Sequence, residues 1–309
     1  MKLLYALCGV LLMNSVWAAP DMVVEGVKMP TWVERGLLRF PAAPGMALNN
    51  NDVLLTGAGA RLLLRAADGS AIKLGENARL QLSGLGQTQA SQSVFTAVMD
   101  VAKGAFRFTT GVLAKLRERQ VTVKVANATI GIRGTDVWGK AGGKMGVSVM
   151  EKVTGQTLER PDKDGKVDFD VVCLIEGKIS VTHANTAPFE MNQAQTFYVM
   201  PQDAAPLPVS SLPTEQLNKW AAETEIAAGQ GAARSGGKWK INLLVANSEK
   251  ETLAAYDELR DAGYAVRILP LTEGQYQLRI TQLPDRAEAE ALARELTGKM
   301  GVVAPVVTR

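Results

Sequence analysis

The chain has 309 residues, of which 47% are hydrophobic and 21% charged, a balance typical of a globular protein long enough for two domains. Its net charge of +3 at pH 7 lies far below the basic excess that nucleic-acid binding requires. Aromatic residues make up only 6% while there are 29 glycines, which favours many short strands joined by turns over a helical bundle.

The N-terminal residues MKLLYALCGVLLMNSVWAAP are predicted to form a secretory signal peptide. Lys2 precedes an apolar run from Leu3 to Leu12, and cleavage is expected after Ala18, so that residues 1–18 are removed. The run is shorter than the ~20 apolar residues needed to cross a bilayer, which disfavours the alternative of an uncleaved anchor. The sequence therefore predicts a periplasmic protein with no transmembrane segment after signal removal.

From Gly45 to Met200 the sequence is a succession of short strand-like runs separated by glycine turns, which predicts one all-β domain. These runs include Ala60–Ala66, Ser70–Leu74 and Val121–Val125. Near Gly134, we expect Arg133 and Asp136 to form a buried ion pair that fixes a tight turn, with the Thr135 hydroxyl bonded to the backbone.

Residues 201–237 are rich in proline and glycine and are predicted to be a linker. Within it, Thr214–Ala228 can form a short helix with Thr214 as its N-cap. Leu217 and Trp220 lie on one side of this helix, which we expect to dock on the β domain.

Residues 238–309 contain two half-units related by one constant sequence offset. Ser248 with Glu251, and Asp285 with Glu288, have the spacing of two capping boxes, each of which begins a helix after a strand. With two further strands, the sequence predicts a small α+β module of βαββαβ order. Proline in the last strand, at Pro305, places that strand at an edge of the sheet.

The strand Trp239–Leu244, the strand Tyr276–Ile280 and the alanine-rich helix around Ala287–Glu290 resemble a SPOR domain over the whole of residues 238–309. The resemblance implies a ferredoxin/RNP-like fold that binds peptidoglycan. Two positions depart from the family pattern, because Asn242 stands where glutamine is common and Gln277 where arginine is common.

A second resemblance covers residues 29–200 and rests on four segments. These are Asp68–Leu74, Lys103–Phe108, Ile130–Asp136 and Ile175–Ile179. Together they resemble a FecR-like domain, a β-rich unit of periplasmic transducers of iron signalling, here with an exposed loop inserted at about Lys152–Asp170. Transducers of this family carry an N-terminal cytoplasmic segment and a membrane helix; we expect neither here, which argues against a direct anti-sigma role.

Strand parity in the last module predicts a polar open face. Trp239, Ile241, Leu243 and Val245 are expected to pack on the helices. The opposite face is predicted to carry Lys240, Asn242, Leu244, Arg267, Gln277 and Arg279. Amides can pair with N-acetyl and hydroxyl groups, and long cationic stems can cover sugar C–H faces, so the SPOR resemblance implies that these six residues bind glycan. A face that is merely solvated is the alternative.

Residues that carry out catalysis are scarce. The single histidine, His183, has no serine or carboxylate arranged beside it and is expected to be exposed and structural. After signal removal Cys173 is the only cysteine, and Asp162, Asp164 and Asp168 lack the glutamate that closes an EF-hand loop. We therefore predict no enzyme activity, no catalytic residue, no metal site and no cofactor.

The sequence thus predicts a non-enzymatic protein whose SPOR-like domain binds peptidoglycan glycan strands and whose FecR-like domain contacts an unidentified envelope protein. RNA binding is disfavoured because the ten Lys and Arg residues of the last module are matched by ten Asp and Glu residues, and because parity turns Tyr276 toward the helices. The alternative function is a signalling or assembly adaptor in which both domains bind protein.

Overall fold

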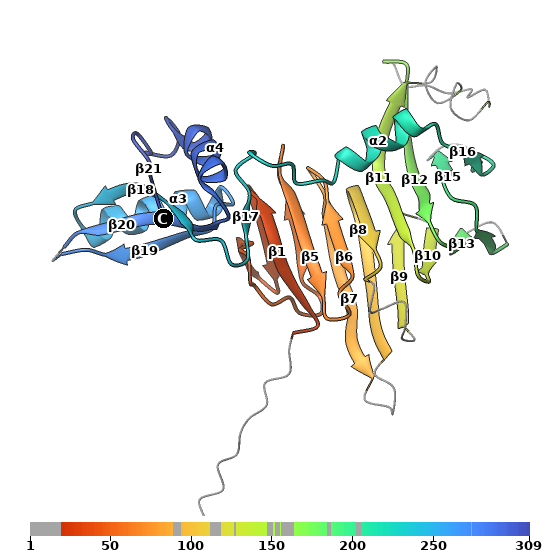
Figure 1. Cartoon of the computed structure of the whole chain (residues 1–309), viewed down its shortest axis with the longest axis horizontal. Helices are drawn as coiled ribbons and strands as arrows, with labels where there is room; N and C mark the ends of the chain where they lie inside the picture. The colour runs from red at the N-terminus through yellow and green to blue at the C-terminus, as the bar shows by residue number, and fades with distance from the viewer. Residues whose placement is uncertain are drawn as a thin grey trace, which may run out of the picture.

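The computed structural model describes residues 20–88, 94–111, 119–126, 128–146, 151, 155, 164–183, 187–201, 205–272 and 274–309. The predicted signal peptide, Asp162 and most of the predicted insertion loop lie outside these residues. The chain forms an all-β N-terminal domain and a small α+β C-terminal domain, which confirms the predicted fold class (Figure 1).

The N-terminal domain consists of two β-sheets that share the long strand β8. Sheet A has the order β17 (Ala233–Arg234), β1 (Met22–Lys28), β5 (Arg61–Ala66), β6 (Ala71–Leu74), β8 (Val94–Thr109), β11 (Asp136–Gly146), β12 (Lys166–Glu176), β15 (Thr196–Pro201) and β16 (Ser210–Ser211). Sheet B has the order β3 (Leu38–Pro41), β2 (Thr31–Arg35), β4 (Val53–Thr56), β7 (Arg79–Thr88), β8, β9 (Arg119–Val125), β10 (Ala128–Ile132), β13 (Ile179–His183) and β14 (Phe189–Met191). The first strand along the chain, β1, starts at Met22, whereas the sequence predicts that this domain starts at residue 29.

The core of the N-terminal domain lies between the two sheets, since each strand turns alternate side chains inward. In β9, Val121, Val123 and Val125 are all buried, as their alternation with polar residues predicts. From sheet A, Phe106 and Phe108 of β8 enter the same cluster of buried side chains.

The predicted ion pair between Arg133 and Asp136 is wrong. Asp136 is bound instead by the guanidinium of Arg107, with Nη2 to Oδ2 at 2.6 Å and Nε to Oδ1 at 2.9 Å, whereas Arg133 is exposed. The reason is that Arg133 follows β10 of sheet B while Asp136 begins β11 of sheet A, next to β8. The Thr135 hydroxyl is buried and has no partner among the described residues. Its backbone is bound to Thr110 instead, with the Thr135 N–H donating to Thr110 Oγ1 at 2.9 Å and the Thr135 carbonyl accepting from the Thr110 N–H at 3.0 Å.

The predicted linker is fastened to the β domain as a strap, the name we use for residues 205–237. Its helix α2 (Thr214–Ala222) begins after Pro213 and ends earlier than expected. Trp220 stacks on Trp138 of β11 with ring centroids 4.8 Å apart and an interplanar angle of 8°. The helix therefore docks on the outer face of sheet A through its apolar side, as its sequence predicts.

After α2, ion pairs hold the strap to sheet A. Glu223 accepts a hydrogen bond from Lys140 at 2.7 Å, and Glu225 accepts from Lys73 at 2.6 Å and from Arg107 at 3.0 Å. The strap then pairs as β17 with β1 (Figure 1). This proline- and glycine-rich segment is therefore bound along the β domain and is not a free linker.

The C-terminal domain packs two helices on one face of a four-stranded sheet. The sheet has the order β19 (Val266–Pro270), β20 (Tyr276–Leu283), β18 (Trp239–Ala246) and β21 (Val306–Thr308), and the helices are α3 (Glu249–Asp261) and α4 (Arg286–Leu296). Side chains of Ser248 and Asp285 cap the helices as the sequence predicts. The strand after Pro305 is an edge strand, also as predicted.

The side chain of Glu288, at the N-terminal end of α4, binds the strap, although the Glu288 backbone N–H donates to the cap residue Asp285. Its buried carboxylate accepts hydrogen bonds from the backbone N–H groups of Gly229 at 2.7 Å, Gly231 at 2.6 Å and Ala232 at 2.9 Å. The corresponding Glu251 of α3 does turn back, accepting from the Asn247 N–H at 3.0 Å. In one half of the repeat the glutamate thus turns back to the residue before its N-cap, while in the other half it attaches the domain to the strap.

The two domains also touch directly. The start of β2 bonds to the end of α3 and the turn after it, with Thr31 N–H donating to the Gly263 carbonyl at 3.2 Å and Trp32 Nε1 donating to the Asp261 carbonyl at 3.2 Å. Gly263 has a φ of +87°, and a Cβ there would lie 2.7 Å from the Trp32 ring. Within the described part of the chain, no helix is long and apolar enough to span a membrane.

His183 and Cys173 both lie in the β domain. His183 is half-buried, with its ring edge-on to Tyr198 at 6.3 Å, so the expectation that it is exposed is wrong. Cys173 is a free, buried thiol. Burial raises the pKa of Cys173 from 9.0 to about 12, with Asp136 adding to the shift and Arg107 opposing it.

Cys173 is therefore expected to resist thiol reagents in the folded protein. The thiolate is the reactive species, and at pH 8 the native protein should hold roughly a thousandfold less of it than the unfolded chain. In a Cys8→Ser variant, a disulfide reagent should label Cys173 slowly in buffer and fast in urea. The rate in buffer should keep rising as the pH is raised above 9, because the pKa of the folded protein is about 12. Equal labelling rates in buffer and in urea would contradict this.

Candidate functional site

The face of the C-terminal sheet that is not covered by helices carries a row of polar side chains across three strands. Arg267 of β19 is paired with Arg279 of β20, and Arg279 is paired with Asn242 of β18. Directly paired residues in antiparallel strands project to the same side of a sheet. The structure therefore brings Arg267, Arg279 and Asn242 together on this face, which we call the open face.

A second row of the open face combines one amide with apolar side chains. Gln277 of β20 is paired with Leu269 of β19 and with Val245 of β18. Val245 is 46% exposed. This row gives the open face aliphatic surface on both sides of an amide.

Strand β18 contains irregularities that sequence parity does not reveal. The pairing shifts between Asn242 and Leu244, so that Leu243 and Leu244 lie opposite the single buried Leu278. Leu244 consequently packs against the core, while Val245 turns outward. The predictions that Leu244 lies on the open face and Val245 on the packed face are both wrong for this reason.

Lys240 of β18 completes the set, beside the edge strand β21. It is paired with Thr308 of β21, and it is separated from Asn242 by the fully buried Ile241. Five of the six predicted residues thus share the open face: Lys240, Asn242, Arg267, Gln277 and Arg279.

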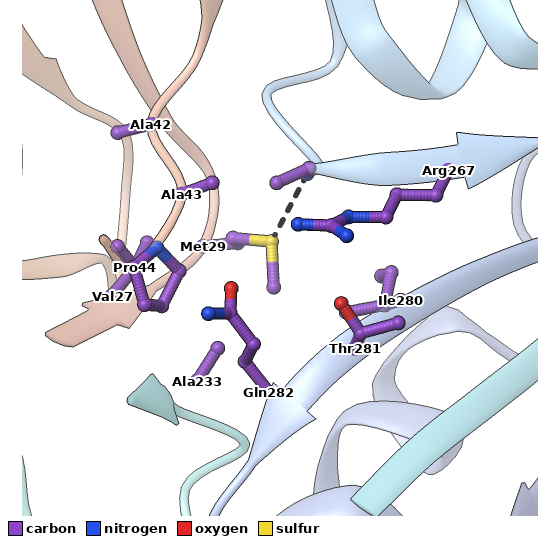
Figure 2. Close-up of a pocket in the computed structure, with 11 residues that line it drawn as sticks. Val27, Met29, Ala42, Ala43, Pro44, Ala233, Arg267, Ile280, Thr281 and Gln282 are labelled. Carbon is purple, nitrogen blue, oxygen red and sulfur yellow. Dashed lines mark hydrogen bonds between the residues drawn. The ribbon is translucent and has the colours of Figure 1, made fainter. Parts of the chain in front are cut away.

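One end of the open face meets the N-terminal domain. Figure 2 shows the Arg267 side chain reaching toward Met29, with Thr281 and Gln282 of β20 beside it and Pro44 across a small pocket. The Met29 sulfur accepts a hydrogen bond from the Ala265 N–H at 3.3 Å, which is the dashed line in Figure 2. Sequence reasoning missed this boundary because Met29 and Pro44 are far from the C-terminal module in the chain.

The open face offers hydrogen-bond donors, acceptors and apolar patches. Amide side chains donate and accept, guanidinium groups donate in a planar fork, and Val245 and Leu269 present C–H surface. Among the described residues there is no group of His, Cys, Asp and Glu that could hold a metal ion. Such a face is chemically suited to a polar ligand with hydroxyl, amide or carboxylate groups.

Comparison with protein families supports both resemblances. A family model for FecR protein matches residues 52–153, and a family model for the SPOR domain matches residues 235–309. Nothing among the curated proteins matches the chain.

Two solved structures are similar to the chain, both of a candidate anti-sigma factor from Parabacteroides distasonis ATCC 8503. One is 10% identical and covers 69% of this chain and 75% of its own, with a TM-score of 0.36. The other is 11% identical and covers 80% of this chain and 91% of its own, also with a TM-score of 0.36.

SPOR domains bind peptidoglycan, FecR domains serve in signalling, and both families are typically associated with the cell envelope. The SPOR match includes the whole open face, whereas the FecR match covers β4 through β11 of the β domain. The chain thus contains a FecR domain followed by a C-terminal SPOR domain.

Proposed function

We propose that this protein is an exported, non-enzymatic periplasmic protein that binds glycan strands of peptidoglycan through the open face of its SPOR domain. The observation that carries the proposal is the pair of rows on that face: one row combines two arginines with an amide, and the other places an amide between two aliphatic side chains. The residues proposed to contact glycan are Lys240, Asn242, Val245, Arg267, Gln277 and Arg279, with Val245 in place of Leu244.

Sugar rings present hydroxyl and N-acetyl groups at their rims and C–H groups on their faces. Asn242 and Gln277 can each donate to and accept from an N-acetyl group. Val245 and Leu269, on either side of Gln277, provide the apolar surface on which a ring can rest. In this proposal the FecR domain contacts a protein of the envelope.

Retention on purified sacculi tests this function. The full chain should be retained, and more strongly after amidase treatment has removed stem peptides. The double variant Asn242→Ala with Gln277→Ala should be retained at least about tenfold less, because two neutral hydrogen-bonding groups are lost. No retention of the unaltered chain on any sacculus preparation would overturn the proposal.

A matched control exists on the strap. Gln216 is half-buried and Asn218 exposed on α2, far along the chain from the open face. The double variant Gln216→Ala with Asn218→Ala removes the same two amides and should bind sacculi like the unaltered protein. Equal losses in the two double variants would show that the open face is not the binding surface.

The second candidate function is an adaptor whose two domains both bind protein. It is favoured by the attachment of the SPOR domain to the β domain. Strand β17 of the strap pairs with β1, and Glu288 of the SPOR domain binds the strap. Under this function, the Asn242→Ala, Gln277→Ala variant keeps its localisation in cells, whereas glycan binding requires enrichment at the wall or septum to fall.

A further inference from the structure

A pocket of about 430 Å³ lies in the N-terminal domain, beside the part of the strap that follows α2. Its lining comes from the start of β5, the turn after β6, the middle of β8, the middle of β11 and the strap. Figure 1 shows the strap running from α2 across these strands toward β17. Pockets of about 300 to 1,000 Å³ hold small molecules in proteins, so this volume is sufficient for a ligand of that class.

The pocket forms where β8 passes from one sheet to the other. Lys103 is paired with Arg79 of sheet B. The next residue, Gly104, is paired with Ala141 of sheet A. Gly104 has a φ of +87°, and a Cβ there would lie 2.5 Å from the Cα of Ala78. This wall of the pocket therefore depends on a close approach that a glycine allows.

The strap closes one side of the pocket. At Gly75, directly after β6, a Cβ would lie 2.8 Å from the carbonyl oxygen of Glu223, so the missing side chain lets the strap approach the sheet. The Glu223 carboxylate accepts a hydrogen bond from Lys140 of β11 at 2.7 Å. This ion pair holds the strap in place and neutralises two of the charges in the lining.

The other three charged residues of the lining are not paired. Arg61, Lys103 and Glu76 all line this pocket, yet in the part of the chain that the structure describes they have no ion-pair partner. Lys103 and Glu76 are exposed, and Arg61 is half-buried. Opposite charges that share a pocket without meeting can each pair with a ligand that carries both signs.

Backbone bonds hold Arg61 and Glu76 on the same turn. Nη1 of Arg61 donates to the Ala60 carbonyl at 2.7 Å, and Oε2 of Glu76 accepts from the Gly59 N–H at 2.6 Å. Each side chain keeps further capacity, because a guanidinium has several N–H donors and a carboxylate several acceptor positions. Asn77, which is exposed and also lines the pocket, adds an amide that can donate and accept.

We propose that this pocket binds a short peptide with free termini, which carries one negative and one positive charge. Arg61 and Lys103 are placed to hold its carboxylate, since the planar fork of arginine suits that group. Glu76 is placed to hold its ammonium group, and Asn77 to bond one of its peptide groups. The site belongs to the FecR domain and goes beyond glycan binding by the open face.

Purely anionic and purely cationic ligands fit this pocket less well. Glu76 and Glu223 place two carboxylates in the lining, and these repel an anion such as phosphate. A metal ion meets three cationic side chains in the same lining. A zwitterion matches both sets of charges.

The test uses trialanine and two blocked forms of it. N-acetyltrialanine lacks the ammonium group, and trialanine amide lacks the carboxylate. In NMR titrations of the full chain, trialanine should give saturable one-to-one binding. Each blocked peptide should bind about tenfold or more weakly, because a charge-assisted hydrogen bond is lost.

Variants matched to the blocked peptides locate the two ends of the ligand. Glu76→Gln should weaken trialanine binding about tenfold and leave the affinity for N-acetyltrialanine unchanged. Arg61→Gln and Lys103→Gln should weaken trialanine binding and leave the affinity for trialanine amide unchanged.

Lys178→Gln is the control for charge. Lys178 is 52% exposed, pairs with Glu190 at 2.8 Å and is not part of the pocket lining, so this variant should bind all three peptides like the unaltered protein. Circular dichroism shows whether each variant is folded, and the exposed Lys103 provides the readout if Arg61→Gln is not.

Several outcomes would overturn the peptide site. These are no saturable binding of trialanine, equal binding of the three peptides, or binding of inorganic phosphate as tightly as trialanine with no effect of Glu76→Gln. Retention on sacculi separates this inference from the proposed function. The Glu76→Gln and Arg61→Gln variants should be retained like the unaltered chain, because the open face lies in the other domain.

Discussion

Replacing Glu288 with alanine is expected to lower the free energy of unfolding by about 3 to 5 kcal/mol. The carboxylate is buried and accepts three backbone hydrogen bonds from Gly229, Gly231 and Ala232. Its removal leaves those N–H groups without an acceptor where water does not readily replace it. Urea denaturation measures the loss, and proteolysis within the strap should accelerate in parallel because the segment is released.

Glu290 provides the control for this change. It lies on the same helix and is 40% exposed, and its only described partner is Arg286 at 2.6 Å. Glu290→Ala should change stability by less than about 0.5 kcal/mol, as is usual for exposed pairs on one helix. Similar losses in the two alanine variants would show that the bonds to the strap contribute nothing specific.

The second large effect is expected at Trp220, whose replacement by alanine should cost about 3 to 5 kcal/mol. Its ring is 5% exposed, stacked on Trp138 and edge-on to Phe197 at 5.9 Å. Removing the ring opens a cavity on the outer face of sheet A and separates α2 from it. Thermal unfolding measures the loss, and the near-ultraviolet circular dichroism of the stacked indoles should weaken.

Lys219→Ala is the neighbouring control, because Lys219 is 64% exposed and its one ion-pair partner among the described residues is Glu215 on the same helix. Its melting temperature should stay within about a degree or two of that of the unaltered protein. If Trp220→Ala melts at the same temperature as Lys219→Ala, the docking of α2 does not stabilise the domain.

Sequence periodicity was sufficient for the local structure. The buried valines of β9 and the N-cap positions of Ser248 and Asp285 depend on interactions within a few residues. The structure has both features as predicted. The edge position of β21 likewise follows from the missing N–H of Pro305. Each of these features depends on chain neighbours alone.

Features that depend on distant parts of the chain were not predictable in this way. Asp136 is bound by Arg107 because two strands of sheet A bring them together, although Arg133 is nearer in sequence. On the open face, periodicity placed five residues, but the irregular pairing at Leu243 and Leu244 exchanged Leu244 for Val245. A bulge of one residue moves every later side chain of the strand to the opposite face of the sheet. The amino-acid composition of the strand does not reveal such a bulge.

The strap covers strand edges of sheet A through which copies of the protein could associate. It contributes both terminal strands of sheet A, beginning with β16 beside β15 and ending with β17 beside β1. Exposed strand edges are templates on which other chains can add and aggregate. A single segment of 33 residues, counted from 205 to 237, therefore blunts both edges of that sheet at once. A chain truncated before the strap would present two unsatisfied edges to every other copy.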